Sequence, residues 1–312
     1  MSTPRRLAVR IAAIPRPVQG ALLMIVATFG FSLMAGLIRF ASQSLDPFQI
    51  VFFRNFFALL FMMPWLARAG LGGLRTERLG LHFGRAAFGL CAMSSWFSAV
   101  ALLPLAQAVA LNFTVPLFAT IAAALVLGEV VRMRRWTATI VGFLGVLVIV
   151  RPGFEDVSPA TSLPILAALF MAGAATAIKS LSDTENPDAM VFYMNLFLTP
   201  MSLIPALFVW QWPDMATFGA VVLIGLIAAT AHQVMTRAFA RADASAIIPF
   251  QYMRLPFSAG VGFLAFGEVP DAWTLAGALV IAGSAIYIAE REAAAARVER
   301  KKAHTDRHTL RD

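Results

Sequence analysis

Long apolar runs follow one another along almost the whole chain, and each is about as long as a lipid bilayer is thick. A membrane-spanning helix needs about 20 mainly apolar residues. Ten such runs can be drawn, at residues 18–39, 47–67, 80–102, 105–128, 135–151, 160–181, 188–209, 216–239, 244–266 and 273–290. Only 13% of the residues are charged, against about 25% in soluble domains. The sequence therefore predicts an all-α integral membrane protein with ten transmembrane helices.

The distribution of positive charge indicates how these helices are oriented. With the N-terminus in the cytoplasm, 20 of the 25 Lys and Arg residues fall in cytoplasmic segments, and only Arg39 and Arg151 fall in outer ones. Cytoplasmic loops of membrane proteins carry such an excess. We therefore expect both termini to be cytoplasmic, with a basic segment over 1–17 and a basic tail over 291–312. The expected location is the cell inner (cytoplasmic) membrane.

The two halves of the chain resemble each other. The stretch Val-Phe-Phe-Arg-Asn-Phe-Phe at 51–57 returns as Val-Phe-Tyr-Met-Asn-Leu-Phe at 191–197, 140 residues later. Further matches recur at nearly the same spacing: Pro116 with Pro256, 127–130 with 266–269 and Trp136 with Trp273. Because each unit holds five helices, an odd number, equivalent helices run in opposite directions. We expect two inverted repeats, 18–151 and 160–290, an arrangement in which transporters bind substrate near the membrane midplane.

Several short motifs stand in a fixed order along the chain: Phe31-Ser32-Leu33-Met34, Asp46-Pro47-Phe48, Phe53-Arg54, Pro104-Leu105-Ala106-Gln107-Ala108, Leu127-Gly128-Glu129, Arg151-Pro152-Gly153 and Phe266-Gly267-Glu268. Their order and spacing resemble the drug/metabolite transporter superfamily, in particular its ten-helix EamA-type members. The resemblance implies secondary transport of small metabolites by alternating access. It implies no single substrate, since members export amino acids or take up nucleosides, vitamins or S-adenosylmethionine. Gln107 stands where the family commonly has an acidic residue.

Two arginines lie deep inside predicted spans, where a charged side chain is costly and usually has a function. They are Arg54 in the second span and Arg254 in the ninth. A planar guanidinium suits the carboxylate of a substrate, whereas the alternative role is to bond backbone carbonyls and fix helix packing. Gln251 and Tyr252 form a polar patch with Arg254. We interpret all four residues as substrate-binding.

His232 is the one histidine deep in a predicted span, and Trp96 occupies the equivalent position in the first repeat. A histidine there either carries a coupling proton, because its pKa lies near working pH, or is a packed hydrogen-bonding residue. Both residues are predicted to face the substrate cavity. The remaining substrate-binding candidates are polar residues near Pro116 and in the second copy of the repeated stretch: Asn112, Thr114, Tyr193 and Asn195.

Four other polar residues are assigned to gating or helix packing. Asn55 points about 100° away from Arg54 on a helix and is expected to bond across helices. Arg85 lies near the cytoplasmic end of its span, where snorkelling to the surface accounts for it. Glu129 and Glu268 end their helices at opposite membrane faces, where carboxylates are solvated or paired.

No Asp or Glu lies deep in any predicted span, so coupling to a proton would rest on His232, and otherwise the protein is a facilitator or exchanger. We expect a secondary transporter of a small carboxylate-bearing metabolite, such as an amino acid or organic acid, and not an enzyme. No cofactor, metal or nucleic acid is expected, and a homodimer is left open. The alternatives are uptake of S-adenosylmethionine or a nucleoside-like metabolite and, from another class, a non-transporting membrane scaffold subunit.

Overall fold

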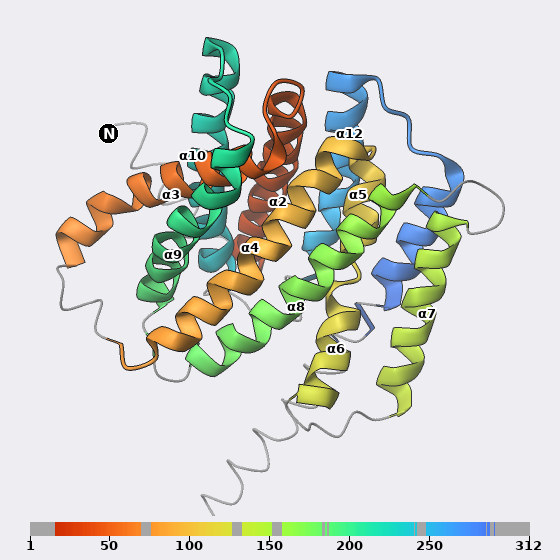
Figure 1. Cartoon of the computed structure of the whole chain (residues 1–312). Coiled ribbons are helices and arrows are strands. Elements are labelled where there is room, and N and C mark those ends of the chain that lie inside the picture. The colour runs from red at the N-terminus through yellow and green to blue at the C-terminus, as the bar shows by residue number, and fades with distance from the viewer. Residues whose placement is uncertain are drawn as a thin grey trace, which may run out of the picture.

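The computed structural model describes residues 16–69, 76–126, 133–151, 158–182, 185, 187–239, 241, 248–284, 286–287 and 290. Within these ranges all regular secondary structure is helical. Seven of the described helices are long and apolar enough to cross a bilayer, and two shorter apolar helices cover Trp136–Val150 and Ala272–Ser284. The chain is therefore an all-α membrane protein, and helical segments lie at each of the ten predicted spans (Figure 1).

The helices follow one another in two series. The first half contains α2 (Arg16–Ala41), α3 (Pro47–Ala69), α4 (Leu79–Leu102), α5 (Leu105–Asn112), α6 (Val115–Val126) and α7 (Met133–Val150). The second half contains the 3-10 turn η2 (Pro159–Thr161), α8 (Ser162–Ser182), α9 (Pro187–Phe208), α10 (Met215–Phe239), the 3-10 helix η3 (Ile248–Met253), α12 (Arg254–Phe266) and the helix Ala272–Ser284.

Two of the spans that the sequence analysis drew as single runs are divided in the structure. The fourth is interrupted between α5 and α6, and the described part of the ninth starts with η3 and becomes α-helical only at Arg254. Proline has no N–H to donate within a helix. Pro116 and Pro256 thus remove the donors that would otherwise bond the carbonyls of Asn112 and Tyr252, four residues earlier in each case. Divided helices of this kind place backbone groups at the midplane of transporters.

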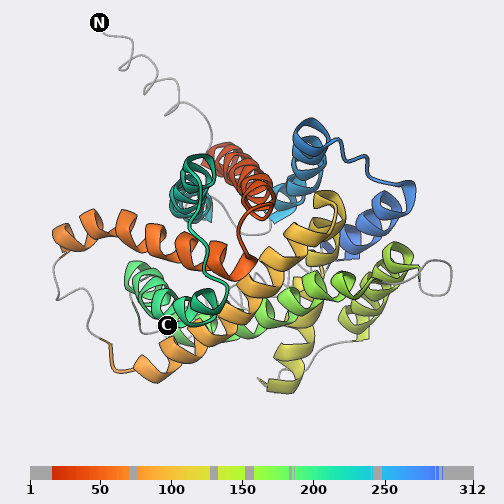
Figure 2. The same cartoon turned by 45° about the horizontal axis from the view of Figure 1, so that its top comes forward.

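The closest packing joins the two halves of the chain. Helix α2 packs against α10, α3 against α9 and α4 against α8, and the last pair runs side by side in both views (Figures 1 and 2). Helix α12 packs against both α2 and α5. The main buried cluster, with Ile38, Val51, Trp96 and Val100 among its members, lies along these contacts. The centre of the molecule is therefore an interface between the halves.

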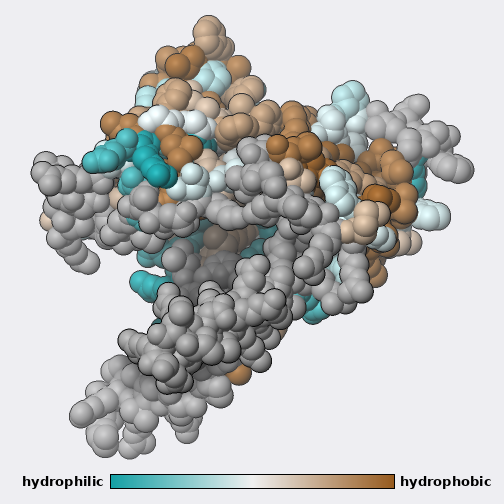
Figure 3. Space-filling view, turned by 90° about the horizontal axis from the view of Figure 1, so that it is seen from below, coloured by the Kyte–Doolittle hydropathy of each residue, from teal (hydrophilic) through white to brown (hydrophobic). Residues whose placement is uncertain are grey.

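The outward-facing side chains are apolar, as expected for a protein surrounded by lipid. On α2 the exposed large side chains recur every three or four residues: Val18, Leu22, Val26, Phe29 and Leu33. This spacing forms one continuous apolar stripe on a helix. Figure 3, which views the molecule from below, shows hydrophobic residues gathered mainly at the top and the right of the described surface and the most hydrophilic residues mainly at the left. The stripe therefore faces the acyl chains of the bilayer.

Helix α7 and the helix Ala272–Ser284 meet at two glycines. A Cβ atom added to Gly277 would lie 2.6 Å from the carbonyl oxygen of Gly145, and one added to Gly145 would lie 2.9 Å from the carbonyl oxygen of Gly277. Small residues allow membrane helices to approach this closely. Because backbone atoms are among the obstructing atoms, side-chain rotation alone cannot make room for a larger residue.

Replacing Gly277 by valine is expected to destabilise the protein by about 1–3 kcal/mol, the usual cost of overpacking. The measurement is the melting temperature in detergent, followed by size-exclusion chromatography. Gly283→Val on the same helix is the matched control, since nothing lies within 4 Å of a Cβ added there. Equal losses in the two variants would contradict the glycine contact.

Candidate functional site

A cavity of about 380 Å³ lies between the two halves, at the level of the divided helices. Its walls come from eight helices: α2, α3, α4, α5, α6, α8, α10 and the η3–α12 segment. Asn112 at the end of α5 and Arg254 at the start of α12 both contribute side chains to it. The breaks in the fourth and ninth spans therefore lie at the cavity, as in transporters that bind substrate at discontinuous helices.

Seven of the ten residues predicted to bind substrate line this one cavity: Arg54, Trp96, Asn112, His232, Gln251, Tyr252 and Arg254. The other three are not among its lining residues. Thr114 is buried, and its hydroxyl donates to the carbonyl of Leu111 at 2.8 Å. Tyr193 instead packs on the ring of His82, with 4.8 Å between the ring centroids. Asn195 accepts a hydrogen bond from Arg54, which is a lining residue, whereas Asn195 itself is not.

The guanidinium of Arg54 is held by two asparagines. Its Nη1 donates to Oδ1 of Asn55 at 2.8 Å and to Oδ1 of Asn195 on α9 at 3.4 Å. Asn195 in turn donates through Nδ2 to the carbonyl of Val191 at 3.0 Å. The prediction that Asn55 turns away from Arg54 is wrong, because the long arginine side chain folds back onto its neighbour. Both asparagines thus fix the orientation of a cavity-lining cation.

Arg254 is held by aromatic rings. Its guanidinium carbon lies 4.8 Å from the ring centroid of Trp96 and 5.9 Å from that of Phe31. These distances fall within the range of cation–π contacts. The Nε atom of Arg254 is buried and forms no hydrogen bond within the described part of the chain. A buried donor of this kind is costly unless a partner occupies it, so Nε can donate to a ligand bound in the cavity.

His232 faces Phe31 edge-on, with 5.0 Å between the ring centroids and an interplanar angle of 83°. Its Nδ1 lies 2.7 Å from the carbonyl oxygen of Ala228. Because a carbonyl oxygen only accepts hydrogen bonds, this contact assigns the proton to Nδ1. In the neutral ring, Nε2 is then an acceptor.

Aromatic and methionine side chains form most of the remaining wall. Tyr252 packs edge-on against Phe113, with 4.8 Å between the ring centroids, and Phe97 also lines the cavity. Five methionines do so as well: Met24, Met34, Met93, Met171 and Met235. Aromatic faces and polarizable thioethers favour a ligand with a flat apolar part. Of these residues, the sequence analysis assigned only Tyr252 to the site; Met34 stands in the motif at 31–34 but was not assigned a role there.

The charge of the cavity is positive. Two arginines line it, and no Asp or Glu is among its lining residues in the part of the chain that the structure describes. Charges in a partly dry site interact strongly, by about 4 kcal/mol at 4 Å for an effective dielectric constant of 20. The cavity therefore favours a ligand that is anionic or rich in hydrogen-bond acceptors.

The residues assigned to gating or packing have different surroundings. Arg85 is buried, and its Nη1 donates to the carbonyl of Met190 on α9 at 2.8 Å. The snorkelling interpretation of Arg85 is therefore wrong, because the side chain crosses to a neighbouring helix that offers a carbonyl. Glu268 is paired, with Arg39 and the backbone N–H of Leu105 as partners. Glu129 lies outside the described residues.

Comparison with known proteins gives a consistent set of matches. The model of the EamA-like transporter family matches residues 18–151 and 159–289. A riboflavin transporter of Vibrio cholerae is 35% identical, over 91% of this chain and 97% of that protein. A riboflavin transporter of Rhizobium johnstonii is 34% identical, over 92% and 95%. An S-adenosylmethionine uptake transporter of Rickettsia bellii is 29% identical, over 80% and 86%.

Proposed function

Because the chain belongs to the EamA-like transporter family, we propose that it moves a planar aromatic, acceptor-rich solute of the flavin class across the cytoplasmic membrane. That the protein is a multi-pass membrane transporter of a small molecule follows from the family. The flavin class is the proposal, and the observation that carries it is the aromatic cavity, lined by two arginines and, among the described residues, by no carboxylate.

The chemistry of a flavin matches this cavity group by group. Its three fused rings are flat and uncharged, and one end carries two carbonyl oxygens and ring nitrogens that accept hydrogen bonds. Trp96 and Tyr252 offer aromatic faces, while Arg54 and Arg254 offer donors. Stacking of a heteroaromatic ring on an aromatic side chain contributes about 1–3 kcal/mol. The hydroxyl groups of the sugar-like chain would bond Asn112 and Gln251.

The other substrates fit less well. S-Adenosylmethionine carries a carboxylate that an arginine can bind, but it also carries a sulfonium cation and an ammonium group, and no Asp or Glu among the described lining residues would pair with either cation. A small aliphatic amino acid would satisfy an arginine but leave the aromatic walls without a partner. The second candidate is therefore an aromatic organic acid, in which a carboxylate meets Arg54 or Arg254 and a ring meets Trp96.

We also propose the membrane arrangement that the charge distribution favours. The N-terminus lies in the cytoplasm, and the two repeats are 18–151 and 160–290. With this orientation, the end of α2 at Ala41 lies at the outer face and the start of α4 at Leu79 lies at the inner face. His232 is the lining residue that would carry a coupling proton, if transport is coupled to one.

The test is uptake by proteoliposomes of radiolabelled riboflavin, S-adenosylmethionine, phenylpyruvate and alanine. We expect saturable riboflavin uptake that is inhibited by lumichrome, which has the flavin rings without the side chain, and not by ribitol. Saturable phenylpyruvate uptake without riboflavin uptake would favour the second candidate. Transport of S-adenosylmethionine or alanine alone would overturn both.

A further inference from the structure

The central cavity extends from the level of the divided helices toward the inner face. Its lining residues on α10, His232 and Met235, stand within the last two turns of that helix. Toward the outer face the space is filled, because the side chains of Ile38, Val100 and Leu105 are each 0% exposed. These residues belong to the main apolar cluster. A solute in the cavity therefore has a closed route on the outer side.

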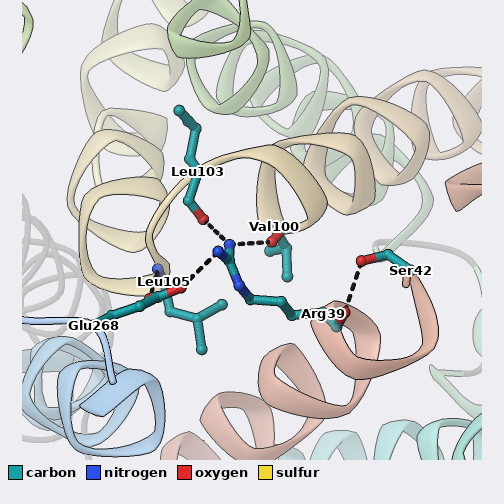
Figure 4. A network of polar contacts seen from close by, with 6 residues as sticks. All are labelled: Arg39, Ser42, Val100, Leu103, Leu105 and Glu268. Carbon is teal, nitrogen blue, oxygen red and sulfur yellow. Dashed lines mark hydrogen bonds and ion pairs between the residues drawn. The ribbon is translucent and has the colours of Figure 1, made fainter. Parts of the chain in front are cut away.

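A network of polar contacts lies above this filled layer, at the outer ends of three segments (Figure 4). Arg39 on α2 pairs through Nη2 with Oε1 of Glu268, which follows α12, at 2.8 Å. Through Nη1 it donates to the carbonyl of Leu103 at 2.5 Å and to that of Val100 at 3.2 Å. The other carboxylate oxygen of Glu268 accepts from the backbone N–H of Leu105 at 2.8 Å.

The two side chains complement the helix ends that they contact. Helix α4 ends with unsatisfied carbonyls, which attract a cation, and α5 begins with unsatisfied N–H groups, which attract an anion. Arg39 is the cation at the end of α4, and Glu268 is the anion at the start of α5. The arginine and the glutamate thus tie α2 and the segment after α12 to the junction between α4 and α5 around Pro104.

The backbone of Glu268 is itself fixed. Gly267 has φ +68°, the left-handed conformation that suits glycine at a helix C-terminus. The N–H of Gly267 bonds Phe263, and that of Glu268 bonds Gly262, at 3.0 and 3.1 Å. A Cβ added to Gly262 would lie 2.8 Å from Oε2 of Glu268. The carboxylate is therefore positioned by the end of α12 and passes over a glycine to reach Leu105.

A second, smaller cavity of about 240 Å³ lies on the outer side of this network, and Glu268 is one of its lining residues. Gln107 of α5 and Ala259 of α12 also line it. On each of these two helices, the outer cavity and the central cavity are separated by five residues, since Asn112 and Arg254 line the latter. Five residues correspond to about 7.5 Å of helix. The two cavities thus lie one above the other along the α5–α12 pair.

We propose that Arg39 and Glu268 form the outer gate of the transport path, closed in this structure, and that their separation connects the two cavities. The proposal rests on the proposed function only in that the path must carry a solute. The side chains are 23% and 14% exposed, with Oε1 of Glu268 itself buried, so water replaces the contacts of the pair only when the segments part.

The test measures access from the outer face to a cysteine placed below the gate. The reporter is Met34→Cys in a Cys91→Ser background, because Cys91 is the one native cysteine. Met34 lines the central cavity, five residues before Arg39 on the same helix. A membrane-impermeant thiol reagent is added to right-side-out vesicles. Glu268→Ala and Arg39→Gln are each expected to raise the labelling rate about tenfold, which corresponds to about 1.4 kcal/mol.

Asp271→Asn is the matched control on the same face. Asp271 pairs with Arg151. Partial burial raises the pKa of Asp271, but hydrogen bonds from Thr274 and the charge of Arg151 lower it more, so the pKa lies below its usual value. The variant therefore removes a real negative charge close to the gate. It is expected to leave the labelling rate unchanged, because the pair joins the end of α7 to the segment after α12 and includes no residue of α2 or α5.

A third variant tests the gate without removing either charged side chain. Gly262→Ala is expected to displace the Glu268 carboxylate and to raise labelling, while the melting temperature reports that each variant is folded. Unchanged labelling in folded Glu268→Ala, Arg39→Gln and Gly262→Ala would overturn the gate, as would an equal rise in Asp271→Asn. Labelling needs no substrate. If the gate variants label faster but the protein takes up no flavin, the result supports the gate and overturns the proposed substrate.

Discussion

Replacing Trp96 by alanine is expected to weaken binding of the transported solute about 100-fold. The tryptophan is 4% exposed, lines the cavity and carries the guanidinium of Arg254 at 4.8 Å from its ring centroid. The loss of ring stacking costs about 1–3 kcal/mol, and the loss of the cation–π contact that positions Arg254 costs about 0.5–2 kcal/mol. The dissociation constant is measured from the quenching of riboflavin fluorescence by purified protein.

Two controls separate binding from folding. Trp96→Phe keeps an aromatic face, and its affinity for the solute is expected to fall by about tenfold or less. Trp212→Ala removes the same side chain at a position that is 84% exposed, and it should bind like the unmodified protein. A folded Trp96→Ala protein with unchanged affinity would show that the solute does not stack at this wall.

Replacing Arg254 by glutamine is expected to weaken riboflavin binding about 10- to 150-fold, because a hydrogen bond to a charged group contributes about 1.5–3 kcal/mol. The same change removes one of the two arginines among the described residues that line the cavity. It should therefore lower the discrimination against S-adenosylmethionine, so that the ratio of the two dissociation constants moves toward one. Equilibrium dialysis with both labelled compounds measures this ratio.

The lysine variant and a remote arginine test the geometry of this contact. Arg254→Lys keeps the charge but loses the planar group that lies on Trp96, and an intermediate affinity is expected. Arg237→Gln, at an exposed position in the last turn of α10, should have no effect. An Arg254→Gln protein that still excludes S-adenosylmethionine would contradict the role of charge in selectivity.

The sequence predicted the polar residues of the cavity better than its apolar ones. Arg54, Arg254 and His232 stand out because polar groups are rare inside apolar runs. The chain has 26 phenylalanines and 14 methionines, and no spacing tells which of them face lipid and which face the cavity. Met171 is on α8 and Phe113 lies between α5 and α6, and both line the cavity because α8 of the second half packs against α4, α5 and α6 of the first.

The side-chain partners of several predicted residues could not be predicted from the sequence, because they depend on how the helices pack. Arg39 and Glu268 were each located at a membrane face, but their pairing depends on α2 and α12 packing together. Tyr193 was grouped with the site through the repeat, yet its ring meets His82 instead. Thr114 was grouped with the site through Pro116, yet its hydroxyl bonds a carbonyl three residues earlier.

The central claim is that the cavity between the halves binds a flavin-like solute, and the most direct measurement is the equilibrium binding of riboflavin to purified protein. We predict one saturable site per chain, displaced by lumichrome but not by S-adenosylmethionine or alanine, and lost in the double variant Trp96→Ala/Arg254→Gln. Saturable binding of S-adenosylmethionine with none of riboflavin, or riboflavin binding that the folded double variant retains in full, would contradict the account.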